Sequence, residues 1–90
     1  MGRRNIIGGH VRKARMAAKP PITQIDLVAR LQMLGAMMDQ STLSKIENDQ
    51  RPVTDIEVVA FAKALKVSVA WLLGETDSPP QYSTTIKEQA

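Results

Sequence analysis

The chain has 90 residues, of which 43% are hydrophobic, so we expect one small domain with a single core. It has no cysteine and one histidine, which excludes disulfides and the usual zinc-binding spacings and leaves no nucleophile–base–orienter set for catalysis. We therefore expect a protein that is not an enzyme and that needs neither a cofactor nor a metal.

The formal net charge of +3 is unevenly distributed along the chain. Residues 1–22 contain six basic residues and no acid, whereas residues 23–90 contain six basic and nine acidic residues. This asymmetry indicates either a polyanionic partner near the N-terminal segment or a solvated helix face. No apolar run approaches the ~20 residues that span a bilayer, and the N-terminal end lacks the pattern of a signal peptide. We expect a soluble, cytoplasmic protein with no membrane partner.

The spacing of apolar residues predicts an all-α fold of five helices without strands. The first helix is expected over 5–18, because two prolines follow it, with an inward side made of Ile7, Val11 and Ala14. The second should begin at Thr23, whose hydroxyl can cap it, and should end at Gly35. Its inward side is expected to consist of Leu27, Leu31 and Leu34.

The third helix, expected over 40–48, has one polar and one apolar side. Asp39 is a good N-terminal cap, because its carboxylate can accept a hydrogen bond from an unpaired backbone N–H. Leu43 and Ile46 should face the core, and the opposite face carries Gln40, Ser41, Ser44 and Lys45. These side chains form hydrogen bonds without negative charge, which is what a helix in a DNA major groove needs.

Two more helices and a tail complete the predicted organisation. Thr54 and Glu57 form a capping box for a fourth helix, whose inward stripe should be Val58, Phe61, Ala62 and Leu65. Ser68 is expected to cap a short fifth helix over 69–73, which Gly74 ends. Residues 75–90 are polar and interrupted by proline, so we expect a domain over 1–74 followed by a flexible, largely disordered tail.

Four segments carry a resemblance when they are taken together and in order. They are Ile7-Gly8 with Val11 and Arg15, Thr23-Gln24 with Leu27 and Leu31, Ser41 to Asn48, and Leu65 to Leu73. Together they resemble the phage-repressor and Cro-like (Cro/C1-type) helix-turn-helix family, also called the xenobiotic-response-element type. The resemblance spans 7–74 and implies a compact five-helix, lambda-repressor-like domain. It also implies a DNA-binding transcriptional regulator, by resemblance a repressor, that reads the major groove with the helix at 40–48.

The resemblance also implies roles for single residues on that helix. The base-edge readers would be Gln40, Ser41 and Lys45, with Ser44 beside them, since glutamine can pair with adenine and lysine with guanine. From the residues alone, Gln40 and Ser41 would be read first as ordinary surface residues. Lys45, in the last turn, could also complement the helix dipole.

Two further sets of residues take roles from the resemblance. Contacts with the DNA backbone would come from Gln24, Asn48 and Arg51. A partly buried, structural ion pair would join Arg15 to Glu47 and hold the reading helix against the first helix.

The chain departs from the family pattern between the second and third helices. Residues 32–38 lengthen this connection, so the second helix should gain a turn and the helix-turn-helix should have an extended turn. The inserted segment contributes four large apolar side chains, which could fill the core or form a protein-interaction patch: Met33, Leu34, Met37 and Met38. The alternative function is therefore an interaction module of the same fold, antitoxin-like or an adaptor, that binds a protein partner through this patch or the tail.

A single domain of this kind reads only a few base pairs. We therefore expect a homodimer, weak or completed on double-stranded DNA, that spans half-sites ~34 Å apart. Candidate pairing surfaces are the fifth helix and the fourth-helix residues Ile56 and Val59, with Trp71 as an anchor. His10 is expected to be a surface residue of the first helix.

Overall fold

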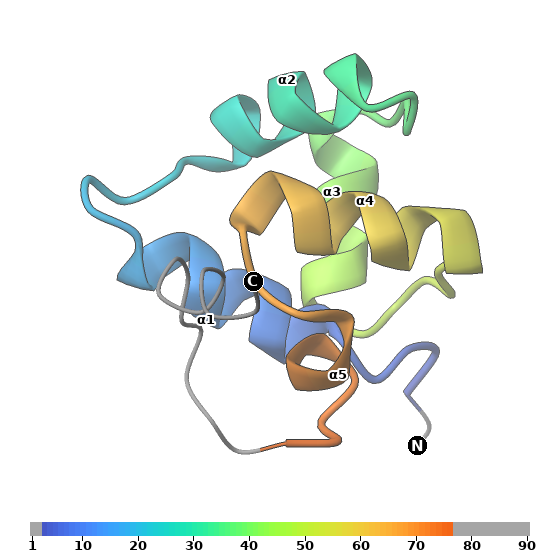
Figure 1. Ribbon diagram of the computed structural model, residues 1–90. Coiled ribbons are helices and arrows are strands. Elements are labelled where there is room, and N and C mark those ends of the chain that lie inside the picture. The colour runs from blue at the N-terminus through green and yellow to red at the C-terminus, as the bar shows by residue number, and fades with distance from the viewer. Residues whose placement is uncertain (1–2, 77–90) are drawn as a thin grey trace.

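The computed structural model describes residues 3–76, and these form five helices and no strand. The helices are α1 (Gly8–Ala17), α2 (Gln24–Met33), α3 (Gln40–Glu47), α4 (Asp55–Leu65) and α5 (Val69–Leu72) (Figure 1). The predicted all-α, five-helix fold is therefore confirmed. Of the tail expected over 75–90, residues 77–90 lie outside the described part of the chain. None of the helices in the described part is long and apolar enough to cross a bilayer.

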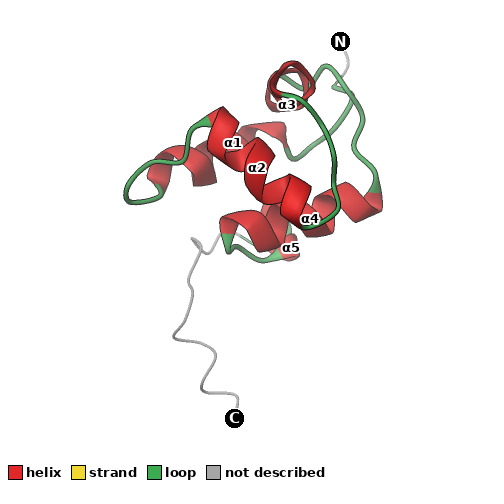
Figure 2. Cartoon of the chain, turned by 90° about the horizontal axis from the view of Figure 1, so that it is seen from above, coloured by secondary structure: helices red, strands yellow, loops and turns green. Residues whose placement is uncertain are grey.

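The helices pack around one core to which every helix contributes. α2 contacts both α3 and α4, and α1 contacts α3, α4 and α5. Figure 2 shows α3 at one edge of the molecule and α4 and α5 at the opposite edge, with α1 and α2 between them. The largest side chains that are fully buried come from all five elements or their flanks: Phe61, Ile7, Leu27, Leu31, Leu43, Ile46, Leu72 and Val11. The inward positions predicted for α3 and for the first two turns of α2 are confirmed.

Side-chain caps start four of the five helices where the sequence placed them. Thr23 and Asp39 each accept a hydrogen bond from the backbone N–H three residues on, at 3.0 Å and 2.8 Å. Ser68 caps α5 in the same way, at 2.9 Å. Thr54 and Glu57 form the reciprocal capping box of α4. Because each cap satisfies a backbone donor that a helix end leaves unpaired, the helix boundaries are set locally.

The first helix begins later than predicted. Asn5 lies outside it, and its Oδ1 accepts hydrogen bonds from the backbone N–H groups of Ile7 (3.0 Å) and Gly8 (2.7 Å). The side chain therefore turns the chain into α1, in place of the turn of helix that we expected there. The expected end at 18 is nearly correct, since Ala18 is the extended residue that follows α1.

The connection between α2 and α3 is extended, as expected, and it begins with a Schellman motif. The N–H of Ala36 donates to the carbonyl of Leu31 (2.9 Å) and the N–H of Gly35 to that of Gln32 (3.0 Å). Gly35 has φ of 86°, a left-handed conformation that glycine adopts without steric cost. Ala36, which follows this turn, is buried in the core.

The apolar side chains of this connection are mostly outside the core. Leu34, which we predicted to face inward, is 44% exposed because α2 has already ended at Met33. Met33 and Met37 are 88% and 67% exposed, so the core-packing interpretation is wrong for both. Met38 alone of the inserted methionines is partly buried against the core.

The N-terminal end of α1 lies directly against the C-terminal end of α3. A Cβ at Gly8 would overlap the backbone carbonyl oxygen of Ile46 and would lie 2.7 Å from Oδ1 of Asp49. A Cβ at the neighbouring Gly9 would meet no atom within 4 Å. Gly8 is therefore required for the approach of the two helices, whereas Gly9 is not.

Gly8→Ala should consequently lower the free energy of unfolding by about 1–3 kcal/mol, the range expected when a packed site is overfilled. Gly9→Ala is the matched control and should leave stability unchanged or raise it by up to about 1 kcal/mol, because alanine favours a helix. Urea denaturation of the two variants gives both values. Equal midpoints would mean that α1 does not approach α3 as closely as described.

Candidate nucleic-acid interface

α3 presents a polar face to solvent and is held from beneath by apolar side chains. Leu43 and Ile46 have no exposed surface. On the other side Gln40, Ser41 and Lys45 are exposed and Ser44 is half-buried, so all four predicted base readers lie on one helix. The helix that carries them has eight residues.

Both ends of α3 are fixed by hydrogen bonds. At its start, the hydrogen bond from the Thr42 amide lowers the pKa of the Asp39 carboxyl below its ordinary value. At its end, the N–H of Gln50 donates to the carbonyl of Lys45 (2.8 Å), and Asp49 takes a left-handed φ of 61°. The Asn48 side chain, exposed beside this turn, donates to the carbonyl of Ser44 at 3.0 Å. Although the helix is short, backbone groups at both of its ends have hydrogen-bond partners.

Asn5 is a buried residue of this site whose role the sequence did not reveal. Its Nδ2 donates to the carbonyls of Ile46 (3.0 Å) and Arg51 (2.8 Å). Together with the two bonds that Oδ1 accepts, this one amide joins the start of α1 to the end of α3 and to the loop that follows. An Asn before an apolar helix signals a cap, but the bonds to residues 46 and 51 could not be read from the sequence.

A buried ion pair ties α1 to the end of α3. Arg15 donates from Nε to Oε2 of Glu47 (2.8 Å) and from Nη2 to Oε1 (2.9 Å), and the two side chains are only 10% and 3% exposed. The remaining guanidinium nitrogen, Nη1, donates to the carbonyl of Ile22 at 3.0 Å. Such a planar, two-bond contact fixes both distance and orientation between the two helices.

The network continues from Glu47 to the start of α3. Nε2 of Gln24, at the first position of α2, donates to Oε1 of Glu47 at 3.1 Å. Oε1 of Gln24 in turn accepts a hydrogen bond from Nε2 of Gln40 at 3.2 Å. The lengthened connection between α2 and α3 has therefore not separated Gln24 from Gln40. The Gln24 side chain positions the Gln40 amide through this hydrogen bond. The spacing of the two residues along the sequence did not indicate the contact.

Arg51 is engaged within the domain. Its guanidinium donates to both carboxylate oxygens of Glu57 at 3.1 and 3.3 Å and to the carbonyl of Pro52 at 2.8 Å. Burial by itself would raise the pKa of Glu57, but the hydrogen bonds from Arg51 and from the Thr54 amide outweigh it and hold that pKa below its ordinary value. Arg51 therefore stabilises the loop between α3 and α4.

Two residues have surroundings different from those expected. Trp71 is buried, with 6% exposure, so it is not available as a dimer anchor. His10 is half-buried and packs edge-on against the Trp71 ring, with the ring centroids 4.7 Å apart. This ring contact joins α1 to α5. The expectation that His10 is a surface residue is therefore only partly correct, since its ring is half-buried against Trp71.

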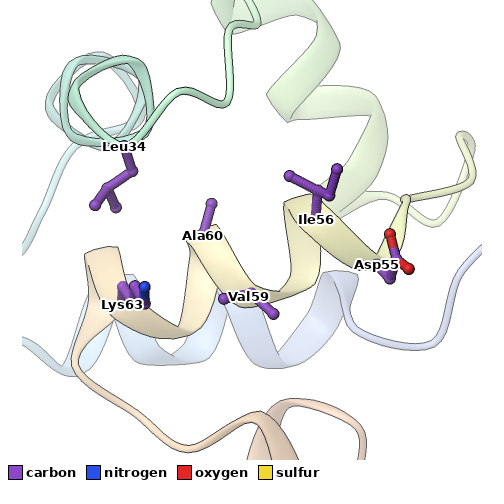
Figure 3. Close-up of a pocket in the computed structure, with 6 residues that line it drawn as sticks. All are labelled: Leu34, Asp55, Ile56, Val59, Ala60 and Lys63. Atoms are coloured by element: carbon purple, nitrogen blue, oxygen red, sulfur yellow. The ribbon is translucent and has the colours of Figure 1, made fainter.

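A shallow apolar groove lies between the end of α2 and the exposed side of α4. Its cavity of about 450 Å³ is lined by Leu34, Asp55, Ile56, Val59, Ala60 and Lys63. Figure 3 shows Leu34 and Ala60 pointing into the space between the two helices, with Asp55 and Lys63 toward opposite ends of α4. Ile56 is 70% exposed and Val59 is 44% exposed, so the groove presents apolar side chains to solvent.

Comparison with known protein families gives one match. Residues 22–72 match the family model described as helix-turn-helix, which is the Cro/C1 type. The match begins just before α2 and ends with α5, so it contains α2, α3 and the connection between them. Comparisons with curated proteins and with solved structures give no significant match.

The ion pair yields a stability prediction. Glu47→Gln should lower the free energy of unfolding by about 3 kcal/mol, because it leaves the buried Arg15 charge without a counter-charge. Arg15→Gln should cost a similar amount. Arg3→Gln is the matched control, since it removes an arginine from the exposed Arg3–Asp49 pair (3.5 Å) and should cost less than about 1 kcal/mol. If thermal or urea unfolding gives the same stability for Glu47→Gln and Arg3→Gln, the buried pair does not hold α3 in place.

Proposed function

The chain belongs to the Cro/C1-type helix-turn-helix family of DNA-binding regulators. We propose that it is a sequence-specific transcriptional repressor that reads the major groove with α3. The observation that carries the proposal is the rigid presentation of the polar face of α3. The helix is capped at both ends, supported by Leu43 and Ile46, and tied to α1 and α2 through Glu47. A helix backbone held in this way loses little conformational entropy when its outward face meets base edges.

Each exposed side chain of α3 has a role in this proposal. Gln40 reads adenine with its amide, which the contact from Gln24 orients before DNA arrives. Lys45 donates to guanine, and Ser41 and Ser44 make the adjoining polar contacts. Because Gln40 and Lys45 are five positions apart on α3, they would meet different base pairs of one half-site.

The backbone contacts have unequal support. Asn48 is exposed at the end of α3, where its side chain can reach a phosphate. Gln24 has one amide N–H bound to Glu47, and its second N–H can donate to a phosphate beside the start of α2. Arg51 can contact DNA only through the guanidinium edge that Glu57 and Pro52 do not occupy. These contacts would fix the register of the protein on the duplex and add little sequence information.

Selection of bound duplexes from a random pool tests the reading helix. Lys45→Ala should weaken binding to the preferred sequence by about 1–3 kcal/mol and should relax the preference at one or two base pairs. Asn48→Ala is the control: because its proposed contact is to phosphate, it should weaken all sequences alike and leave the preference unchanged. An unchanged preference with Lys45→Ala would rule out Lys45 as a base reader.

We also propose that two copies bind one operator, since one α3 reads too few base pairs for useful specificity. The second candidate function, an interaction module, is favoured by the apolar groove on α4. Its occupant would be an amphipathic helix of another protein, with a basic residue toward Asp55 and an acidic residue toward Lys63. Because Figure 2 shows α4 on the side away from α3, both functions could operate at the same time.

Sedimentation velocity on a selected operator duplex separates these surfaces. The unmodified protein should give two chains per duplex, and Ile56→Asp should give the same result if the groove binds a different protein and takes no part in pairing. Strictly one chain per duplex would contradict the dimer. Loss of the second chain in Ile56→Asp alone would make the groove the dimer interface instead.

A further inference from the structure

The exposed side of α1 forms a second polar groove with the end of α3. The groove, of about 550 Å³, is lined by Gly9, Arg12, Lys13, Met16, Glu47 and Asn48, together with Ala17. Arg12 and Lys13 are both exposed on this side of α1. The groove therefore adjoins the polar face of α3 at Asn48 and is continuous with the candidate interface.

The acidic groups near this groove are already paired with arginines. Glu47 is neutralised by Arg15, and Asp49 lies 3.5 Å from Arg3. Within the described residues, neither Arg12 nor Lys13 forms an ion pair. The groove consequently carries two uncompensated positive charges. These two residues belong to the six basic residues that give segment 1–22 its positive charge.

The groove is also open to a bulky, linear polyanion. Gly9 has no side chain and no neighbour within 4 Å of where a Cβ would stand, so the backbone of α1 can be approached there. Figure 2 shows α1 nearer to α3 than α5 is. A linear anion held at α3 would extend past Asn48 into this groove and meet Arg12 and Lys13 there.

We propose that this α1 groove binds the sugar–phosphate backbone of the same duplex whose bases α3 reads, with Arg12 and Lys13 each contacting one phosphate. The inference rests on the proposed function, because it needs a duplex at α3. It extends that function by adding a sequence-independent contact surface on α1, outside the two helices of the helix-turn-helix. Asn48, at the junction, would link the two surfaces.

The salt dependence of binding tests the proposal. Each phosphate contact contributes about 0.9 to the slope of log affinity against log salt concentration, so the double variant Arg12→Gln/Lys13→Gln should reduce the slope by about 2. Affinity should be measured by fluorescence anisotropy on a selected duplex and on an unrelated duplex, each of about two helical turns (~21 base pairs). The variant should lose affinity for both duplexes by the same factor and keep the sequence preference.

A matched double variant serves as the control. Lys63→Gln/Lys66→Gln removes two exposed positive charges from the α4 side, so it has the same net charge but should keep the slope of the unmodified protein. Both double variants should melt at the unmodified temperature, because all four side chains are exposed. If the unmodified protein binds neither duplex, the proposed function itself fails. If it binds but the two double variants have equal slopes, only the α1 contact is overturned.

Discussion

The structure depends on one buried carboxylate, that of Glu47. It accepts hydrogen bonds from Arg15 on α1 and Gln24 on α2 while belonging to α3 itself. α3 has eight residues, and an isolated helix of that length is marginal in water. Its position must therefore come from tertiary contacts, and an ion pair with two defined bonds restricts rotation of the helix more than apolar packing alone can. Such a buried pair adds little stability compared with apolar side chains of similar size, but loss of one partner is costly because it leaves the other charge unpaired.

Other contacts at the two ends of α3 also fix the position of this helix. The Asn5 amide holds the carbonyl of Ile46, and the absence of a side chain at Gly8 lets α1 reach that point. At the opposite end the Asp39 cap sets the first turn, and Gln24 orients Gln40. All of these groups fix a short surface helix without placing any of its outward side chains in the core. That is the arrangement expected where a helix must be presented rigidly to a partner.

Features that depend on neighbouring residues could be predicted from the sequence. The caps at Thr23, Asp39, Thr54 and Ser68 were predictable because each side chain bonds a backbone group three residues away. Apolar periodicity likewise predicted the fully buried Leu27, Leu43 and Ile46. The pairing of Arg15 with Glu47 joins residues 32 positions apart, and it could be expected only through the family resemblance.

The remaining errors concern tertiary structure. Leu34 continued the apolar period of α2, but the Schellman turn at Gly35 ended the helix first and left this side chain beside α4. Trp71 was expected at a surface, yet the half-buried His10 packs against its ring. Asn5 was expected inside the first helix. Its actual partners, the carbonyls of residues 46 and 51, are remote in the sequence and could not be foreseen. Periodicity describes one helix at a time, so it cannot say what a second element brings to the same face.

The distribution of paired and unpaired charge separates the two sides of the molecule. On the α3 side the acids Glu47 and Asp49 are each occupied by an arginine, which leaves Lys45, Arg12 and Lys13 to set the local potential. On the α4 side Glu57 is paired with Arg51, and Asp55 stands in the first turn of a helix, where negative charge complements the helix dipole. A duplex approaching from solution would therefore be attracted to the unpaired positive charges of α1 and α3. In the proposed function the internal ion pairs would therefore help to orient the docking of DNA as well as the position of α3.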